Sequence, residues 1–343
     1  MNSKKTYPFS FSILIIAVIV CFLANLSLGS VAIPMASIFK TLLGADLPNN
    51  TWSTIIITYR LPKAFTAILV GSGLGVSGLL MQTLFRNPLA GPFVLGISSG
   101  ASLGVALIIM GASLFGGISS LILSTKWSLV IAASLGSFLV LLAVMLVSVK
   151  VRDTMAILII GLMFASLTAA VVSVLSYFAS AEQLQQYIFW GFGSLGDLDW
   201  NELLVLASVC LVGILLSIAS VKSLNTFLLG ENYAKSLGLH IQRSRIVIII
   251  ATSLLAGAIT AFVGPIGFIG LAIPHMARQI FNTSNHKTLI PAVMLFGAIV
   301  LLICDSIAQL PASDYTLPIN AITSIIGAPV VIWLLVRKRK MIF

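Results

Sequence analysis

The chain has 343 residues, of which 59% are hydrophobic and only 8% are charged, and its mean hydropathy is +1.13. Soluble domains carry roughly 25% charged residues, so a soluble protein of this composition could not cover its surface with polar groups. A net charge of +10 would suggest nucleic acid in a soluble chain. Here the solvent must be lipid, and the position of the charge along the chain is more informative than its sign.

Apolar runs that approach the ~20 residues of a membrane-spanning helix recur throughout the chain. They do not alternate as the strands of a β-barrel would. We therefore predict an all-α integral membrane protein with about ten transmembrane helices. The predicted spans are roughly 11–28, 61–83, 93–110, 127–149, 155–178, 201–221, 246–263, 266–281, 289–310 and 317–336. The span 266–281 is short, and the weakly apolar stretch 111–125 is where a further span could hide.

With ten spans, both termini lie on one side of the membrane. That side receives 15 of the 19 Lys and Arg residues, and the other side receives Lys40, Arg60, Lys63 and Lys126. Because basic loops stay in the cytoplasm, we predict cytoplasmic termini. The long run 11–28 favours an uncleaved first helix over a signal peptide. The three cysteines all fall inside predicted spans and indicate no disulfide framework.

The first external segment, 29–59, is long enough for a short amphipathic helix near Pro34–Leu43. Arg60 and Lys63 follow it with Pro62 between them, and Pro suits the first turn of a helix. Both basic side chains can then project from the outer end of the second span. The local pattern gives equal weight to a docking surface for a partner and to an anchor at the lipid headgroups.

Glycines in the second span form the sequence VGSGLGVSG, in which Gly73, Gly75 and Gly78 match the dinucleotide pattern G-x-G-x-x-G. We reject a nucleotide site because no strand precedes the motif and no βαβ unit follows it. In a bilayer, Gly71 and Gly75, with Ser72 and Gly78 nearby, make a groove for close helix packing.

The segment LFRNPLAGPFVLGISSGASLG contains Pro88 and Pro92, which predict a cytoplasmic turn at 86–92. Small residues at 96–102 then indicate contact with other helices, as tight packing or as the wall of a polar path, and the pattern favours packing. The external stretch 179–200 carries three acids and two tryptophans. We expect it to lie at the membrane interface, either as a partner surface or as a plain anchor.

A compact polar loop at 222–245 separates the sixth and seventh predicted spans, and it should form two short helices. Leu228, Ala234 and Leu237 give the loop an apolar side, and basic residues surround it. A structured basic loop inside the cell suits the docking of a partner. The local pattern alone gives equal weight to a simple connector with solvated charges.

The predicted ends of the two loop helices come from their glycines. The first helix stops at Gly230, and the second opens with Glu231, an acid that suits a helix N-terminus. The second helix ends at Gly238, with Leu239 placed to contact Ala234 in a glycine-terminated cap.

After the loop, FVGPIGFIGLAIPHMARQI breaks the apolar pattern. The interrupting residues are Gly264, Pro265, Gly267, Gly270 and Pro274. Broken helices are tolerated only where protein or a water-filled cavity covers the free backbone groups, so this segment is a candidate gate or pathway wall. The three histidines are scattered without metal-ligand spacing and should be packed or loop residues. Asp305 lies near the outer end of a span, where a carboxylate is a functional candidate or simply reaches water.

Three classes of function remain: an ion-coupled carrier, a membrane enzyme, or the membrane half of a machine powered elsewhere. A carrier needs intramembrane carboxylates, and only Asp305 qualifies. An enzyme needs a convergent polar set, and none is found in the sequence. No G-x-x-x-x-G-K motif is present, so the chain carries no Walker site for ATP. The third class needs an inner docking loop and an outer recognition surface, and both have candidates.

Several segments together resemble the FecCD-type permeases of iron-chelate (siderophore) and vitamin B12 ABC importers. They are Arg60–Lys63 with the glycine-rich span, RNPLAGPFVLGISSGASLG, LNTFLLGENYAKSLGL, FVGPIGFIGLAIPH, GFGSL at 191–195 and IGAPVVIWLL at 326–335. The resemblance covers most of the chain. It implies a type II ABC importer permease fold, with residues 1–343 as one permease domain in the bacterial cytoplasmic (inner) membrane.

The resemblance also implies partners. The permease would form a two-fold dimer with a copy or a paralogue, with two ATPase subunits inside and one substrate-binding protein outside. ATP would be used by the ATPase subunits, and this chain would bind no cofactor, metal or nucleic acid and catalyse no reaction itself. The implied cargo is a ferric chelate, with cobalamin or haem as alternatives and an ion-coupled secondary transporter as a more distant one.

Site roles follow from the resemblance residue by residue. The ATPase-coupling residues would be Leu228, Gly230, Glu231, Ala234, Leu237 and Gly238. Asn87, Leu89 and Thr154 match a cytoplasmic gate. Together with the residues of the broken segment, they complete the predicted gate and pathway set: Gly264, Pro265, Gly267, Gly270 and Pro274. Arg60 and Lys63 match the basic pair that meets the binding protein. The chain departs from the family at Gln309, where Arg is common, and at Thr316–Asn320, where Glu-Leu-Pro-x-Gly is common.

Overall fold

The computed structural model describes residues 7–44, 50–111, 125–148, 154–309 and 315–336. Within those ranges the regular structure is helical and contains no strand, which confirms the all-α prediction. The helices are α1 (Pro8–Ser27), α2 (Met35–Leu42), α3 (Asn50–Thr54), η1 (Ile55–Arg60), α4 (Leu61–Leu84), η2 (Pro92–Leu95), α5 (Ile97–Ile109), α7 (Lys126–Ser148), α8 (Thr154–Phe178), α9 (Ala181–Phe192), α10 (Trp200–Ala219), α11 (Val221–Phe227), α12 (Glu231–Ser236), α13 (Ile241–Val263), α14 (Ile269–Phe281), α15 (His286–Ala308) and α16 (Ile319–Val336).

Each of the predicted spans coincides with one of these helices. Among the described residues, seven helices are long and apolar enough to cross a membrane. The helices α5 and α14 have 13 residues each, about 20 Å at 1.5 Å per residue, which is shorter than a hydrocarbon core of ~30 Å. The count of ten crossings therefore stays a prediction. Most of the doubtful stretch 111–125 lies outside the described residues.

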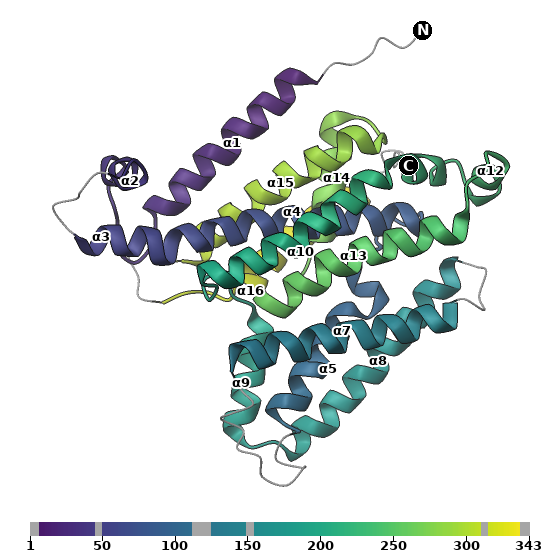
Figure 1. Cartoon of the computed structure of the whole chain (residues 1–343), viewed down its shortest axis with the longest axis horizontal. Helices are drawn as coiled ribbons and strands as arrows, with labels where there is room; N and C mark the ends of the chain where they lie inside the picture. The colour runs from purple at the N-terminus through teal and green to yellow at the C-terminus, as the bar shows by residue number, and fades with distance from the viewer. Residues whose placement is uncertain (1–6, 45–49, 112–124, 149–153, 310–314, 337–343) are drawn as a thin grey trace.

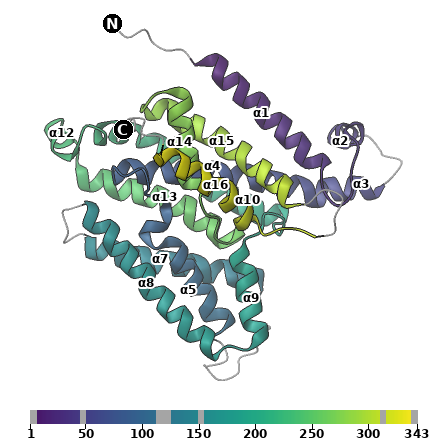
Figure 2. The ribbon, with the colours of Figure 1, turned by 180° about the vertical axis from the view of Figure 1, so that it is seen from behind.

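The helix α4 lies at the centre of the larger group of helices (Figures 1 and 2). It packs against α10, α13, α14 and α15, and α1 flanks α15 on the outside. The helices α5, α7 and α8 form a second group that α13 joins to the first. The amphipathic helix predicted near Pro34–Leu43 is present as α2. The external stretch 179–200 contains α9, whose Tyr187 donates a hydrogen bond to Ser102 of α5.

Close backbone packing explains the glycines of α4. A Cβ atom added to Gly71 would lie 2.1 Å from the carbonyl oxygen of Gly297 in α15, and one added to Gly78 would lie 1.8 Å from that of Gly270 in α14. The hydroxyl of Ser72 also donates to the carbonyl of Met294, at 2.9 Å. These contacts confirm the prediction of a packing groove.

The small residues of α5 serve the same purpose against α7. A Cβ atom on Gly100 would come within 2.5 Å of the Gly136 carbonyl oxygen, and one on Gly104 within 2.0 Å of the Ala132 oxygen. Tight helix packing, the favoured interpretation of this segment, is therefore correct at both glycines.

The second span begins earlier than predicted. Pro62 is the second residue of α4 and lies in its first turn, as predicted, but α3 and η1 run into α4 without a break from Asn50. The stretch η1 is a π-helix, in which the Leu61 N–H donates to the carbonyl of Ile56 five residues back. In that register Pro62, which has no N–H, leaves the carbonyl of Ile57 free. The indole Nε1–H of Trp200 donates to this carbonyl at 3.1 Å.

Candidate functional site

The central loop folds as its caps predict. Gly230 (φ +100°) precedes α12, which opens with Glu231. At the other end Gly238 has a φ of +82°, its N–H donates to the Lys235 carbonyl at 3.0 Å, and the Leu239 N–H donates to the Ala234 carbonyl at 3.0 Å. This pair of bonds is a Schellman motif, the glycine cap expected from the sequence.

An ion pair fastens α12 to the start of α13. Arg245 in the first turns of α13 is buried, and its guanidinium lies 2.9 Å from the Glu231 carboxylate. The predicted apolar side is divided: Ala234 faces inward and is fully buried, whereas Leu237 is 60% exposed. Tyr233 is exposed as well. The loop thus presents apolar side chains outward on a firmly held backbone.

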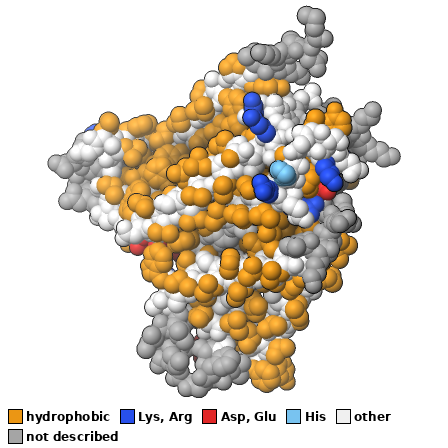
Figure 3. Space-filling model, turned by 45° about the vertical axis from the view of Figure 1, so that its right-hand side comes forward, with side chains coloured by type: hydrophobic (Ala, Val, Ile, Leu, Met, Phe, Trp, Pro, Cys, Tyr) orange, Lys and Arg blue, Asp and Glu red, His pale blue; other side chains and the backbone are white. Residues whose placement is uncertain are grey.

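A cavity of about 720 Å³ lies between α12 and the start of α13. It is lined by residues 231–232, 235, 238–243 and 245, several of them basic. Lys and Arg side chains gather on the face of the molecule that carries α12 (Figure 3). This face can accept an acidic surface with apolar patches.

The predicted cytoplasmic turn at 86–92 is held by hydrogen bonds from its own side chains and its neighbours. The Asn87 carboxamide oxygen accepts from the Leu89 N–H at 2.9 Å, and the Asn87 N–H donates to the Gln82 carbonyl at 3.1 Å. The ring Nε2 of His275 lies 3.0 Å from the Pro88 carbonyl oxygen. Leu89 itself is 43% exposed. Thr154 is the first residue of α8, and its side chain lies outside the part that the structure describes.

The broken segment at 264–268 is covered by protein. Gly264 has a φ of +80°, and a Cβ there would lie 2.7 Å from the Trp190 carbonyl oxygen. The Gly267 N–H donates to the Asn320 side chain in α16 at 3.0 Å. Beyond the break, Gly270 and Pro274 belong to α14, and Gly270 packs against α4. The Val263 carbonyl just before the break accepts from the Ser194 N–H at 2.8 Å, and the Gly267 N–H is bound by α16, so protein covers these backbone groups, the first of the two predicted environments.

Arg60 lies differently from the prediction, because its side chain turns inward. It is 8% exposed, and its guanidinium donates to the carbonyls of Leu26 at 2.6 Å and Ser27 at 3.1 Å, and to that of Val31. The last carbonyls of α1 have no partner within that helix, so a forked cation that can serve several of them at once is favoured over an exposed position. In this structure Arg60 caps α1.

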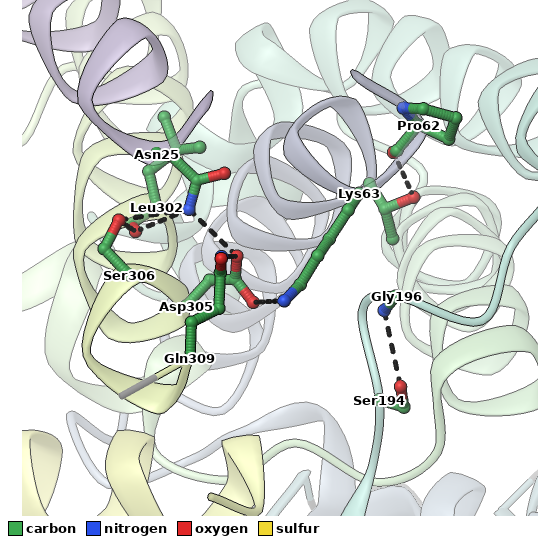
Figure 4. A network of polar contacts seen from close by, with 10 residues as sticks. Asn25, Pro62, Lys63, Ser194, Gly196, Leu302, Asp305, Ser306 and Gln309 are labelled. Carbon is green, nitrogen blue, oxygen red and sulfur yellow. Dashed lines mark hydrogen bonds and ion pairs between the residues drawn. The ribbon is translucent and has the colours of Figure 1, made fainter. Parts of the chain in front are cut away.

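Lys63 and Asp305 form an ion pair at 3.1 Å (Figure 4). Asp305 does not reach water, since it is 2% exposed and also accepts from Asn25 at 2.9 Å and from Gln309 at 2.7 Å. We call Asn25, Arg60, Lys63, Asp305 and Gln309 the outer polar cluster. Cavities of about 360 and 480 Å³ open beside it, and Lys63 lines both.

A second group of polar residues, buried except for the half-buried Asn225, was missed by the sequence analysis. We call Gln82, Thr83, Asn225, Arg278 and His286 the inner polar cluster. Arg278 lies within α14 and is 5% exposed. His286, treated as a packed or loop residue, is fully buried between Asn225 and Thr83. The sequence did contain a signal for this cluster, because polar and charged residues within or beside apolar spans are candidates for a functional site.

Comparison with known proteins agrees with this architecture. The model of the FecCD transport family matches residues 16–337. The hemin transport system permease protein HmuU of Yersinia pestis is 33% identical over 99% of both chains. The vitamin B12 import system permease protein BtuC of Klebsiella pneumoniae is 37% identical over 82% of both. A solved metal-chelate type ABC transporter in an inward-facing conformation superposes with a TM-score of 0.83 at 31% identity, over 97% of this chain and 100% of the other.

The helical architecture and these matches define the class, a multi-pass permease subunit of an ABC importer. ATP hydrolysis in such importers belongs to a separate subunit. Within that class the chain belongs to the FecCD transport family.

Proposed function

We propose that this permease carries a ferric chelate from an external binding protein into the cytoplasm. The observation that carries the proposal is full-length similarity to a permease of a hemin transport system, since hemin is an iron porphyrin. Uptake of radiolabelled ferric siderophore, hemin and cobalamin in cells with and without the gene tests it. Loss of ferric siderophore or hemin uptake in the deletion strain is the expected result, and loss of cobalamin uptake alone would overturn it.

Cobalamin is the second candidate cargo. The vitamin B12 relatives are as similar in sequence, at 34–37% identity, although they match over 82% of the chain. Both cargoes are large, rigid metal complexes. The same uptake experiment separates them.

The loop 222–245 is proposed to dock the ATPase subunit. Its support is a glycine-capped, ion-paired backbone that presents Tyr233 and Leu237 outward beside basic residues. A partner with an acidic rim around an apolar pocket fits that surface. We further propose that residues 1–343 act as one permease domain, and that two permease subunits and two ATPase subunits assemble in the bacterial inner membrane.

Arg60 and Lys63 are proposed to dock the external binding protein. This role requires that their contacts within the permease, to the end of α1 and to Asp305, leave them accessible to a partner. Both line cavities at the outer end of α4, so carboxylates of a binding protein could approach them. The expected result is that Arg60→Glu weakens association with the binding protein more than Arg60→Ala, and more at low salt. Affinity for the permease–ATPase complex in nanodiscs measures this. Equal affinities at low salt would leave Arg60 as the cap of α1 alone.

The proposed topology places both termini in the cytoplasm. Lys126 and Lys287 are exposed and lie at opposite predicted sides, so Lys126→Cys and Lys287→Cys are a matched pair. In a background without native cysteines, a membrane-impermeant maleimide should label position 126 from outside intact cells and leave position 287 unlabelled. Labelling of position 287 from outside would reverse the proposed orientation.

A further inference from the structure

The inner polar cluster joins four helices that come from distant parts of the sequence. Asn225 belongs to α11 in the central loop, His286 opens α15, Gln82 and Thr83 end α4, and Arg278 lies in α14. Three of these side chains, Gln82, Thr83 and His286, are 0% exposed, and Arg278 is 5% exposed. Buried polar side chains usually find hydrogen-bond partners, and here the partners come from neighbouring helices, so the contacts tie the four helices to one another.

The contact between the central loop and α15 is a pair of hydrogen bonds. The Asn225 carboxamide oxygen lies 2.9 Å from the His286 backbone nitrogen and 2.8 Å from its ring Nδ1. The other end of the same amide donates to Asn285 at 3.1 Å, which fixes the orientation of the carboxamide. The oxygen can only accept, so the network assigns a proton to Nδ1 of His286.

The proton on Nδ1 determines how His286 contacts Thr83. With its proton on Nδ1, the neutral imidazole has an acceptor at Nε2, 2.8 Å from the Thr83 hydroxyl. The Thr83 hydroxyl has two acceptors within reach, His286 Nε2 and the Leu79 carbonyl at 2.9 Å, and the tautomer assigned above directs its single proton to Nε2. The guanidinium of Arg278 donates to the Thr83 oxygen at 3.4 Å and to the Gln82 side-chain oxygen at 3.3 Å. The chain of contacts thus runs from α11 through α15 and α4 to α14.

The far end of this chain reaches the turn at 86–92. Gln82 accepts at its backbone carbonyl from the Asn87 N–H, and its amide donates to the Leu271 carbonyl of α14 at 3.2 Å. His275, three residues before Arg278 and so on the same side of α14, contacts the Pro88 carbonyl oxygen at 3.0 Å. Two of the four helices, α4 and α14, therefore hold the turn directly.

Apolar contacts alone would not transmit a directed movement along this route. The buried Leu224 and Phe227 hold α11 against its neighbours. Such apolar contacts resist separation of the surfaces more than sliding, because the hydrophobic effect has no direction. The hydrogen bonds of Asn225 and His286 add direction, since their strength falls steeply with misalignment. A displacement of α11 must then carry the ends of α15 and α4 with it.

We infer that the inner polar cluster is the link through which an ATPase on the central loop moves the turn at 86–92, with Thr83 and His286 as its positioning residues. The inference deepens the proposed function and rests on it. It assigns a part in coupling to buried residues outside the loop, in addition to the residues on the loop surface.

The test uses the permease with its ATPase in nanodiscs. Nitroxide labels at Leu89→Cys and Lys126→Cys, in a background with the native cysteines replaced by alanine, report the distance between the turn and the outer end of α7. Electron–electron double resonance compares the nucleotide-free complex with the ATP–vanadate state. The expected distance shift in the otherwise unchanged chain should fall at least two-fold in Thr83→Val, while ATP hydrolysis continues.

Two matched variants separate coupling from stability. Thr83→Ser keeps the hydroxyl and should keep the shift. Ser72→Ala removes another hydrogen bond between α4 and α15, outside the cluster, and should also keep it. A merely structural role of Thr83 would lower the melting temperature and leave the shift intact. His286→Gln repeats the test if Thr83→Val does not fold.

The outcomes distinguish the two proposals. A full shift in both Thr83→Val and His286→Gln overturns the link, and so does the absence of any shift in a parent complex that hydrolyses ATP. If no ATPase subunit binds the parent permease, the proposed function of the loop fails, and the link fails with it.

Discussion

The two ends of α4 carry buried polar groups that are built differently. At the outer end, Lys63 pairs with Asp305, and Asn25 and Gln309 complete the carboxylate's hydrogen bonds. At the inner end, no carboxylate takes part in the hydrogen bonds just described, and amide, hydroxyl, imidazole and guanidinium groups follow one another across four helices. In the outer polar cluster, three side chains converge on the carboxylate of Asp305. The inner polar cluster instead extends to the central loop at the surface.

This difference teaches what each end is suited for. An ion pair whose carboxylate is fully satisfied holds α1, α4 and α15 together, and it gains little from any further partner. A chain of single hydrogen bonds has no such centre, so a change at one member alters the next. The outer end is therefore expected to govern stability, and the inner end to govern coupling.

The largest effect is expected from the outer ion pair. Asp305→Leu should lower the free energy of unfolding by about 3–5 kcal/mol, because it leaves a lysine with restricted access to water and no counter-charge. The double variant Lys63→Met/Asp305→Leu should recover most of that loss. Unfolding in detergent, followed by tryptophan fluorescence, measures both. If the double variant is as unstable as the single one, the pair is not the origin of the stability.

Arg60→Ala should lower the free energy of unfolding by about 2 kcal/mol, because hydrogen bonds from a charged group contribute about 1.5–3 kcal/mol and the carbonyls at the end of α1 would lose their donor. Arg60→Lys should fall between, since an ammonium cannot serve the same carbonyls as a planar fork. The same unfolding measurement applies. A loss of binding-protein affinity with unchanged stability would instead support the docking role.

Gly238→Val tests the inner end against an equivalent outer position. Gly238 (φ +82°) and Gly44 (φ +74°) both have left-handed backbones with open space around them. Valine should therefore strain each by about 1–2 kcal/mol. Only Gly238→Val should also reduce ATPase binding or ATP hydrolysis by the assembled complex. Equal effects of the two variants on ATPase assembly would remove the special role of the loop.

The smallest effect is expected at the π-helix. Trp200→Phe removes the hydrogen bond to the Ile57 carbonyl and keeps an aromatic ring beside Phe65. The expected loss of stability is about 0.5–1.5 kcal/mol, with ATP hydrolysis unchanged. A clear fall in the rate of ATP hydrolysis, with the free energy of unfolding unchanged, would show that the outer end also takes part in coupling.

Local features of the fold were predictable because their causes are local. The caps of α12 follow from Gly230, Glu231 and Gly238 in one short segment. The glycines of α4 indicate close helix packing whichever helices they contact. The π-helix was not predictable in the same way. It depends on a carbonyl that Pro62 leaves free and on Trp200, which approaches from a distant part of the sequence.

The side chains of the candidate site were harder to predict, because the sequence does not show which helices are neighbours. Arg60 looked exposed because it stands at the end of an apolar run, yet the end of α1 lies beside it. His286 looked isolated, yet Asn225 and Thr83 converge on it from more than 60 and 200 residues away along the chain. Residue type marked these positions as unusual, and only the packing showed what they contact.

The backbone contact between Gly71 and Gly297 has a mechanical consequence. No side chain separates α4 from α15 there, so the distance between the two axes is set by the hard surfaces of peptide groups. The Ser72 hydroxyl also donates to the Met294 carbonyl beside this contact, so the two helices resist sliding and bend together, more stiffly than either helix alone. A push at one end should then reach the other end as a tilt, with little of it absorbed by rearranging side chains in between.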